Sequence, residues 1–527
     1  MRAKAPFRLL YNNDTTNTAG VVSPWHEDGR PFEESLLVAS IEEVAGRGVD
    51  AYMLSPGMGW VPWWQSKVDP VFFAWWKERT GLEVTGTRGY EKYVYEGGDM
   101  VRVLADTCRR HGMAPFVSLR LNDVHCQEHY ESKDQLSLVC CRLYVEHPEW
   151  HIDRHHASKT GYYSQRGMDW AVPEVRAYKL ALLAELAEKY DLAGLELDFL
   201  RDNTLFRPET TDEATRVEII TGFVAQVRAA LDRAKPGRYL SVRIPLDLKA
   251  HGAIGLDVRR LREAGVDMFN LSGWYHTTQR SSIADVRKLA DDAAIYLEMT
   301  HSTGWHPYFQ PAVAYGTMGD PRTSDHQFYT TALLAHRRGA DGLSLFNFIY
   351  YRMGHQADVP VTEPPFHVLP RLNDLPFLAR QSQYYMLSHT YYLRQLPREI
   401  AAGQAKTFEL DMTRRAPDPA GDATPDEIAT ALKGGPSENG GRLRLHCDRA
   451  LAAEDEIVVR FNDAALEPCA DASRFFGNPF DPMISPAGHR RAWRLPPELV
   501  REGRNTVQVE LAQGKSFKLV YLDIGIP

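Results

Sequence analysis

One junction recurs along the chain: a helix-like segment ends at glycine or a basic residue, and a short apolar run follows at once. Glycine after a helix tolerates a positive φ and so ends the helix. The apolar runs do not alternate strictly with polar residues, which is typical of parallel strands covered on both faces. The junction occurs at residues 46–55, 110–119, 189–199, 263–272 and 337–346.

Three further apolar runs bring the set of predicted strands to eight, and they lie at residues 7–12, 239–245 and 294–299. The segments between strands carry apolar residues at helical spacing, most clearly at residues 35–44, 173–189, 217–231 and 325–338. Strands that alternate with helices predict a parallel sheet with right-handed crossovers. Eight such units favour closure into a (β/α)8 TIM barrel, with a doubly wound open sheet as the alternative.

The pattern changes near residue 396. Beyond it, short strand-like runs are separated by Gly, Pro, Asn and Asp clusters, which is typical of an antiparallel sandwich or jelly roll. We therefore predict an α/β chain of two domains, a barrel at residues 1–395 and a C-terminal all-β sandwich at residues 396–527.

The composition excludes several classes of protein. The 527 residues carry a net charge of −8 and no cluster of Lys and Arg, so neither nucleic acid nor a membrane is an expected partner. The six cysteines form no C-x-x-C pair and no glycine-rich phosphate motif occurs, so no cofactor is expected. The N-terminal segment has no apolar signal region. We expect a cytoplasmic chain, or a periplasmic or secreted one if a signal has been removed, and a homo-oligomer is left open.

The carboxyl ends of the predicted strands combine carboxylates, amides and arginines with aromatic rings. Functional groups of a closed barrel project from these ends. Aromatic faces stack on sugar rings while polar groups bond the hydroxyls, so the mixture indicates a carbohydrate, unless the aromatic residues are loop core. The candidate substrate-binding residues are Asn12, Asp14, Trp60, Arg120, Asn122, His125, Glu196, Arg201, Asp202, Arg243, Asp247, Trp274, Tyr275, His276, His301, Asn347 and Tyr350.

Two acids on separate strands suit cleavage of a glycosidic bond. That reaction needs an acid for the leaving oxygen and a second carboxylate that acts as nucleophile or as base for water. Asp198 ends the fourth predicted strand and Glu298 lies on the seventh, so the two carboxylates can face each other across the barrel mouth. We predict them as the catalytic pair, with Asp247, Asp202 or Asp14 as substitutes. The sequence does not decide between nucleophile and acid, although it slightly favours Glu298 as proton donor.

Glu196 lies two residues before Asp198, so a continuing strand points both side chains into the barrel. A buried carboxylate must be paired, protonated or functional. Glu196 is therefore either an interior acid bonded to Arg120 or Arg243, or a member of the site.

A metal site is the less favoured interpretation of the histidines. His125 and His129 are four residues apart and close to Asp123, a spacing that holds zinc on a helix. The segment is more typical of a loop, and no H-E-x-x-H motif occurs, so we expect no metal.

Four motifs resemble those of the bacterial family 10 glycosylhydrolase-like barrel proteins. They are RLNDVH at Arg120, EHPEW at Glu146, MDWAVPEVRAY at Met168 and YDLAGLELDFLRD at Tyr190. The resemblance implies a barrel hydrolase that acts on a polysaccharide or oligosaccharide, and it carries Asp198 and Arg201 over as active-site residues. The chain departs from the better-known retaining barrels, which end the fourth strand with Asn-Glu where this sequence has Asp-Phe.

The function expected from these observations is that of a glycoside hydrolase. One alternative is a polysaccharide lyase on the same barrel, with Tyr or His as base and Arg120 and Arg243 against a uronate carboxylate. Another is a non-catalytic glycan-binding protein, in which the carboxylates only bond hydroxyls.

Overall fold

The structure is a computed structural model. It describes residues 4–14, 25, 31–85, 90–125, 127, 129–153, 166–201, 203–208, 210–304, 321–352, 363–390, 394–414, 441–471 and 485–527. Among these residues no helix is both long and apolar enough to cross a lipid bilayer.

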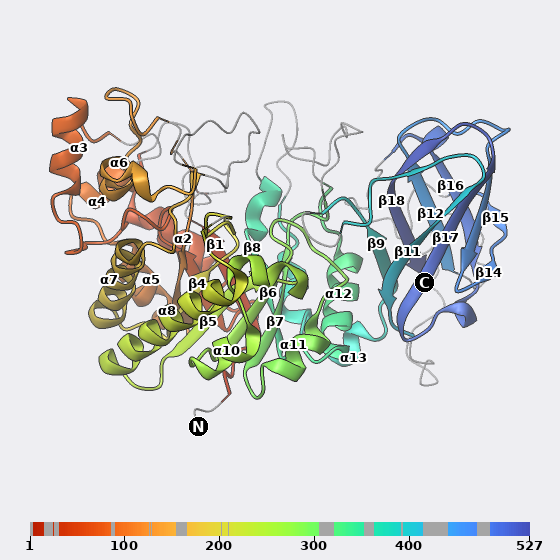
Figure 1. Cartoon of the computed structure of the whole chain (residues 1–527). Coiled ribbons are helices and arrows are strands. Elements are labelled where there is room, and N and C mark those ends of the chain that lie inside the picture. The colour runs from red at the N-terminus through yellow and green to blue at the C-terminus, as the bar shows by residue number, and fades with distance from the viewer. Residues whose placement is uncertain are drawn as a thin grey trace. The chain divides into compact units, whose positions relative to one another are not determined.

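Eight parallel strands form a closed barrel (Figure 1). The first strand pairs with the second and also with the eighth, with Leu10 opposite Ala51 on one side and Ser344 on the other. The predicted barrel is therefore confirmed, and the open-sheet alternative is wrong. The strands are β1 Leu9–Asp14, β2 Ala51–Ser55, β3 Ala114–Arg120, β4 Gly194–Asp198, β5 Tyr239–Pro245, β6 Met268–Ser272, β7 Ala294–Thr300 and β8 Gly342–Phe346.

The junction glycines behave as the sequence predicts. Gly265 and Gly339 have φ angles of 102° and 97°, which stop the chain from continuing as a helix just before β6 and β8. All residues of both strands are buried, as expected for a parallel sheet between a packed interior and a layer of helices.

Helices cover the outside of the barrel, and all four predicted segments are helical. The longest, α8, begins earlier than predicted because the Asp212 side chain accepts a hydrogen bond from the Thr215 N–H and caps it. The helices are α2 Glu34–Glu42, α3 Phe72–Thr80, α4 Tyr90–Tyr95, α5 Met100–Arg110, α6 Arg142–Glu146, α7 Pro173–Lys189, α8 Glu213–Ala234, α9 His251–Ile254, α10 Val258–Glu263, α11 Ile283–Leu289, α12 Asp325–Arg337 and α13 Leu375–Leu378.

The barrel interior changes from apolar to charged along the strands. Near the strand starts, a cluster that includes Leu10, Met53 and Phe116 fills the interior. Further along, the register places Ser118, Glu196 and Ser241 side by side on β3, β4 and β5. Two residues later the same register aligns Arg120, Asp198 and Arg243. The polar side chains are therefore concentrated toward the carboxyl ends of the strands.

The C-terminal part forms two antiparallel sheets, which confirms the predicted β-sandwich. One sheet has the order β10-β18-β12-β16-β15, with β9 also paired to β18, and the other has the order β11-β17-β13-β14. A shared apolar core, including Phe408, Leu443 and Trp493, fixes this part as a β-sandwich. The strands are β9 Gln383–Leu387, β10 Arg398–Ile400, β11 Gln404–Met412, β12 Gly441–Cys447, β13 Glu456–Phe461, β14 Ala464–Ala465, β15 Pro468–Cys469, β16 Arg490–Leu495, β17 Gly503–Gln513 and β18 Phe517–Ile526.

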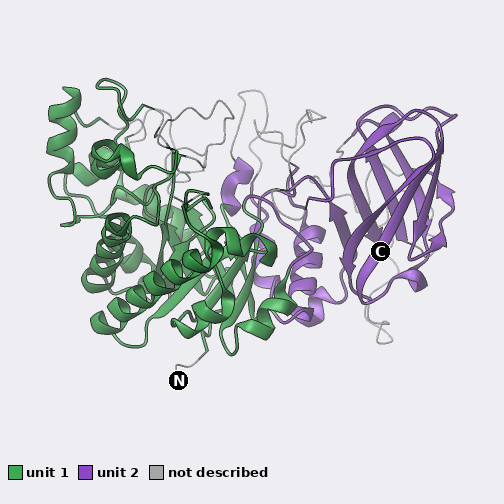
Figure 2. Cartoon of the chain, viewed as in Figure 1, with its two compact units in different colours: residues 1–274, 282–298, 340–347 green, residues 275–281, 299–339, 348–527 purple. Residues whose placement is uncertain are grey.

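The chain divides into two compact units, shown in Figure 2. Unit 1 comprises residues 1–274, 282–298 and 340–347, and unit 2 comprises residues 275–281, 299–339 and 348–527. Within unit 2, helix α12 is tied to the sandwich where Arg338 forms a 2.6 Å ion pair with Asp411 of β11. The domain boundary after residue 395 stays a prediction.

Candidate active site at the carboxyl ends of the strands

One arginine joins the two predicted catalytic carboxylates. Arg243 on β5 donates from Nε and Nη2 to the two oxygens of Glu298, each at 2.7 Å. Its Nη1 donates to the two oxygens of Asp198 at 3.1 and 3.2 Å. Asp198 and Glu298 are therefore brought together, but the guanidinium group of Arg243 lies between them.

Glu298 is the more enclosed of the two acids. Its side chain has no exposed surface, and it also accepts hydrogen bonds from Ser272 Oγ and from Asn270 Nδ2. Burial raises the pKa of Glu298 above its ordinary value, although Arg243 and Ser272 oppose the rise. With both oxygens engaged, Glu298 is well placed to hold Arg243 in position.

Asp198 ends β4 and is 2% exposed. Besides Arg243, its Oδ1 accepts a hydrogen bond of 2.9 Å from the backbone N–H of Leu200, in the loop that follows the strand. Within the part of the chain that the structure describes, its Oδ2 accepts a single hydrogen bond, of 3.2 Å from Arg243. Asp198 therefore keeps acceptor capacity on one oxygen at the strand end, where a barrel enzyme places its chemistry.

Glu196 lies deeper in the barrel and is a fully satisfied interior acid. Its partners are hydroxyl and amide groups rather than the arginines expected from the sequence. Burial raises the pKa of Glu196 to about 7, and the charge of Asp198 adds to the rise. The donors are Asn12 Nδ2 at 2.7 Å, Ser118 Oγ at 2.8 Å, Ser241 Oγ at 3.0 Å and Asn270 Nδ2 at 3.2 Å.

A second arginine is also shared by two carboxylates. Arg120 donates from Nη2 to Asp14 and from Nη1 to Asp123, each at 2.9 Å. Asn347 donates to Asp14 at 3.1 Å and has a φ of 48°, a left-handed conformation that asparagine tolerates. This second ionic network therefore links the ends of β1, β3 and β8.

The loop after β3 extends the second network toward solvent. His125 Nδ1 lies 2.6 Å from Asp123 Oδ1, and an Arg201 guanidinium N–H faces His125 Nε2. The side chain of His125 is 24% exposed, whereas that of Asp123 is completely buried. Although burial alone would raise it, the pKa of Asp123 is held below its usual range by His125 and Arg120. Among the described residues, no group of three or more His, Cys, Asp and Glu side chains is placed to hold a metal ion.

Three predicted residues support the loops of unit 1. Trp60 is 1% exposed, donates from Nε1 to the carbonyl of Asp123 at 2.9 Å, and has the Lys179 ammonium 3.7 Å from its ring centre. Asn122 bridges loops by donating from Nδ2 to two backbone carbonyls. Asp247 caps the short helix Leu248–Ala250. Trp60 and Asn122 thus fix the loop backbone around Asp123, and their role in the site is structural.

Trp274, a predicted site residue, follows β6. It is partly exposed, and its φ of 70° is rare for a bulky residue. Its carbonyl oxygen accepts a hydrogen bond of 3.3 Å from Arg243 Nη2, so the strained backbone is tied to the same arginine as Asp198.

Four predicted residues belong to unit 2. Tyr275 is partly exposed, and its carbonyl accepts a hydrogen bond from Ser302 Oγ at 2.7 Å. His276 is fully buried, which lowers its pKa to about 3. The ring centres of His301 and Tyr350 lie 5.3 Å apart. Asp202, predicted as a site residue, lies outside the residues that the structure describes.

Several small polar residues that bond the buried acids were not among the predicted site residues. Ser118 and Ser241 lie two residues before Arg120 and Arg243, and Ser272 donates to Glu298. A signal for the first two was present, because residues two apart on a strand share a face.

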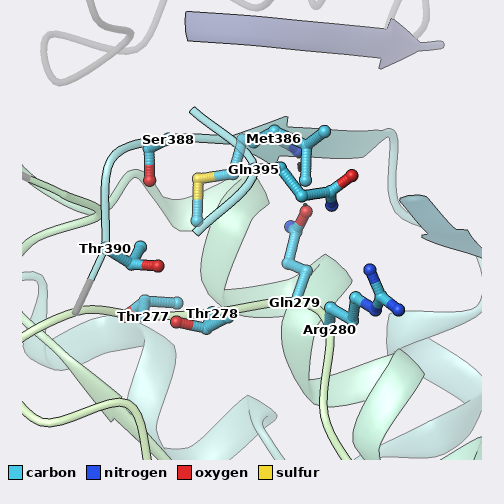
Figure 3. A pocket seen from close by; sticks show the side chains of 9 residues that line it. Thr277, Thr278, Gln279, Arg280, Met386, Ser388, Thr390 and Gln395 are labelled. Carbon is cyan, nitrogen blue, oxygen red and sulfur yellow. Dashed lines mark hydrogen bonds between the residues drawn. The ribbon is translucent and has the colours of Figure 1, made fainter. Parts of the chain in front are cut away.

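A small cavity in unit 2, shown in Figure 3, is too small for a sugar. It measures about 20 Å³, which suits about one water molecule. Gln279 beside it donates to the carbonyl of Tyr384 at 2.7 Å and accepts from the N–H of Met386 at 2.8 Å. These contacts join the segment after β6 to strand β9, so this cavity is a structural feature.

No family model matches the chain, and no curated protein matches it. Solved structures of glycoside-processing enzymes do match. An α-L-fucosidase from Paenibacillus thiaminolyticus is 14% identical with a TM-score of 0.40, over 71% of this chain and 49% of that one. A β-galactosidase from Marinomonas ef1 is 11% identical with a TM-score of 0.42, over 71% and 60%. An α-amylase from Geobacillus thermoleovorans is 11% identical with a TM-score of 0.38, over 95% and 98%.

TM-scores and sequence identities this low carry no argument about function. The fold therefore rests on the strand pairing, and any function has to be argued from the side chains. The matched part spans only about half of the fucosidase chain, 49%. The resemblance to the family 10 glycosylhydrolase-like proteins stays a prediction.

Proposed function

We propose that the chain is a glycoside hydrolase whose reaction takes place at the carboxyl ends of the barrel strands. The observation that carries this proposal is the environment of Asp198. Its carboxylate lies at the end of β4, is fixed by Arg243 and the Leu200 N–H, and keeps acceptor capacity on Oδ2. A carboxylate fixed in this way is suited to attack the anomeric carbon of a sugar or to stabilise its developing positive charge.

In this proposal Asp198 and Glu298, the predicted catalytic pair, have different roles. A bond that is cleaved between two carboxylates needs open space between them, and Arg243 fills that space. Glu298 is therefore the anchor that orients Arg243, and Arg243 in turn orients Asp198. The role of Glu298 is one of positioning, and the second proton-transfer group has to come from elsewhere on the rim.

The charge of the site favours a neutral sugar. Among the described residues of the two networks, the carboxylates are Asp14, Asp123, Asp198 and Glu298, and the arginines are Arg120, Arg201 and Arg243. Arg120 and Arg243 are both buried and each is shared by two acids, so neither is available to a uronate carboxylate. A lyase would need that interaction, and the hydrolase is therefore the better-supported function.

A screen of neutral poly- and oligosaccharides tests the proposal. The wild-type chain should produce new reducing ends without an unsaturated, ultraviolet-absorbing product, and Asp198→Asn should abolish this activity while sparing binding. The matched control is Asp267→Asn, because Asp267 is also a buried acid paired with an arginine, Arg228 at 3.2 Å, but precedes β6 at the opposite end of the barrel. Equal activity of Asp198→Asn and wild type would contradict the proposed role.

A further inference from the structure

The hydrogen bonds around His125 define which ring nitrogen carries the proton. Arg201 can only donate, so the Nε2 that faces it must be an acceptor. The ring proton then lies on Nδ1 and is donated to Asp123 Oδ1 at 2.6 Å. In this hydrogen-bonding pattern Nε2 is therefore the ring nitrogen that accepts, and it faces the Arg201 guanidinium group.

Asp123 is built to stabilise a charged form of this histidine. Its carboxylate is buried and accepts from three donors: the His125 ring, the His125 backbone N–H at 2.8 Å and Arg120 Nη1 at 2.9 Å. The fixed negative charge lies on the side of the ring opposite to Nε2. An imidazolium formed at His125 would therefore be held by an ion pair already in place.

His125 and Asp198 belong to adjoining strand ends. Arg120 and Asp198 are register partners on β3 and β4, and the backbone N–H of Leu121 donates to the Asp198 carbonyl at 3.0 Å. The loops that follow these strands meet where Arg201 contacts His125. The strand end that carries Asp198 and the loop that carries His125 therefore adjoin at the same rim of the barrel.

We propose that His125 is the proton-transfer group of the site and that Asp123 is its positioning residue, which rests on the proposed function above. Asp198 attacks the anomeric carbon, the bond to the leaving oxygen breaks with its electron pair on that oxygen, and the His125 imidazolium supplies the Nε2 proton. Water then returns one proton to Nε2 and its hydroxide to the anomeric carbon, which releases Asp198. Two displacements at one carbon retain the anomeric configuration.

Arg201 has to leave Nε2 before the ring can take up a proton from solvent. Its side chain is partly exposed, so this movement does not require unpacking of the barrel. The charged groups that face His125 among the described residues are Asp123 and Arg201, with Arg120 one contact further away. A bound sugar that draws Arg201 to its hydroxyls would therefore favour protonation of His125.

The first test measures the ring itself and does not depend on turnover. In ¹⁵N NMR spectra of histidine-labelled protein, with the signal assigned by His125→Gln, the neutral ring should be the Nδ1–H tautomer. Asp123→Asn should weaken this preference. The exposed pair of His147 and Glu149, with Nδ1 to Oε1 at 2.9 Å, provides the control, and His147→Gln should leave the His125 signal unchanged. An Nε2–H tautomer in the wild type would overturn the proposal.

The second test uses leaving groups of different acidity. His125→Gln should lower kcat/KM about 10²- to 10⁴-fold for the glycan that the screen identifies, but less than about 10-fold for the matching glycosyl fluoride, which needs no proton. Asp123→Asn should show the same bias to a smaller degree, and the product should keep the anomeric configuration of the substrate. Equal losses on both substrates, or an inverted product, would overturn the proposal and leave the role of Asp198 standing. A wild-type chain that cleaves no glycan would overturn the proposed function and this inference with it.

Discussion

The barrel and the C-terminal sandwich each bury an arginine among carboxylates, and the clusters around Arg243 and Arg444 can be compared directly. In the barrel, Arg243 is shared by Asp198 and Glu298. In the sandwich, Arg444 donates from Nε and Nη2 to Asp523 at 3.0 and 2.6 Å. The remaining capacity of Asp523 is used by Tyr384 Oη at 2.9 Å and by the His446 ring at 3.3 Å.

The difference lies in where each cluster lies in the fold. Both clusters reach a partly exposed side chain, because Arg444 Nη1 lies 3.7 Å from Asp471, which is 19% exposed, and the Arg120 network of the barrel continues to His125, which is 24% exposed. Only the acids of the barrel, however, lie at the carboxyl ends of parallel barrel strands. Burial of an ion pair is therefore no sign of a functional site, and its position at these strand ends is the more informative property.

The largest effect is expected from Asp198→Asn. If the strand end is the site of chemistry, turnover should fall on the order of 10⁴-fold or more, while the midpoint of denaturant unfolding changes little. Steady-state kinetics and urea titration of the same preparation give both values. A variant that unfolds more easily but has normal turnover would show that the barrel cluster, like the sandwich cluster, only stabilises the fold.

The opposite result is expected from Arg444→Met. Removal of the arginine leaves Asp523 buried without its ion pair, which should cost about 3–5 kcal/mol of unfolding free energy. Catalytic turnover per folded molecule should stay unchanged. Chemical denaturation monitored by tryptophan fluorescence measures the loss, and a loss below about 1 kcal/mol would show that the sandwich cluster is not structural.

A smaller effect, dependent on pH, is expected from Glu196→Gln. Burial raises the pKa of Glu196 from 4.5 to about 7, so the folded chain holds a proton that the unfolded chain releases. The resulting stability is complete below pH 4.5 and is lost as the pH rises through about 7. Between about pH 5 and 8 the wild type should lose on the order of 3 kcal/mol relative to the glutamine variant. Unfolding free energies across this range provide the measurement. The control is Glu96→Gln, because Glu96 follows helix α4 and its side chain is exposed.

The smallest effect is expected from an ion pair on the surface. Arg260 and Glu218 join helices α10 and α8, with side chains that are 38% and 65% exposed. Glu218→Gln should leave the denaturant midpoint of unfolding almost unchanged and turnover unaffected, because solvent screens an exposed ion pair. A larger change in denaturant midpoint would mean that contacts other than this ion pair depend on Glu218.

The fold could be predicted largely from the sequence because each barrel strand is a short run that is almost entirely buried, and most of these runs follow a helix-ending residue. The partners of each charge could not. Arg120 and Asp198 are register partners, yet the Arg120 side chain forms its ion pairs with Asp14 and Asp123 instead. Which acids an interior arginine meets depends on the stagger of strands around the barrel and on χ angles, which the pattern does not determine. His125 and Asp123 are only two residues apart in the sequence. Their contact is therefore the easiest of these interactions to predict from the sequence.

The most direct test of the account is a crystal structure of Asp198→Asn in complex with an oligosaccharide that the wild type cleaves. We expect a sugar ring whose anomeric carbon lies against residue 198, with the leaving oxygen within hydrogen-bonding distance of His125 Nε2 and with Arg201 moved away from that nitrogen. A sugar bound only to the C-terminal sheets, or one at the strand ends with no contact to residue 198, would contradict it.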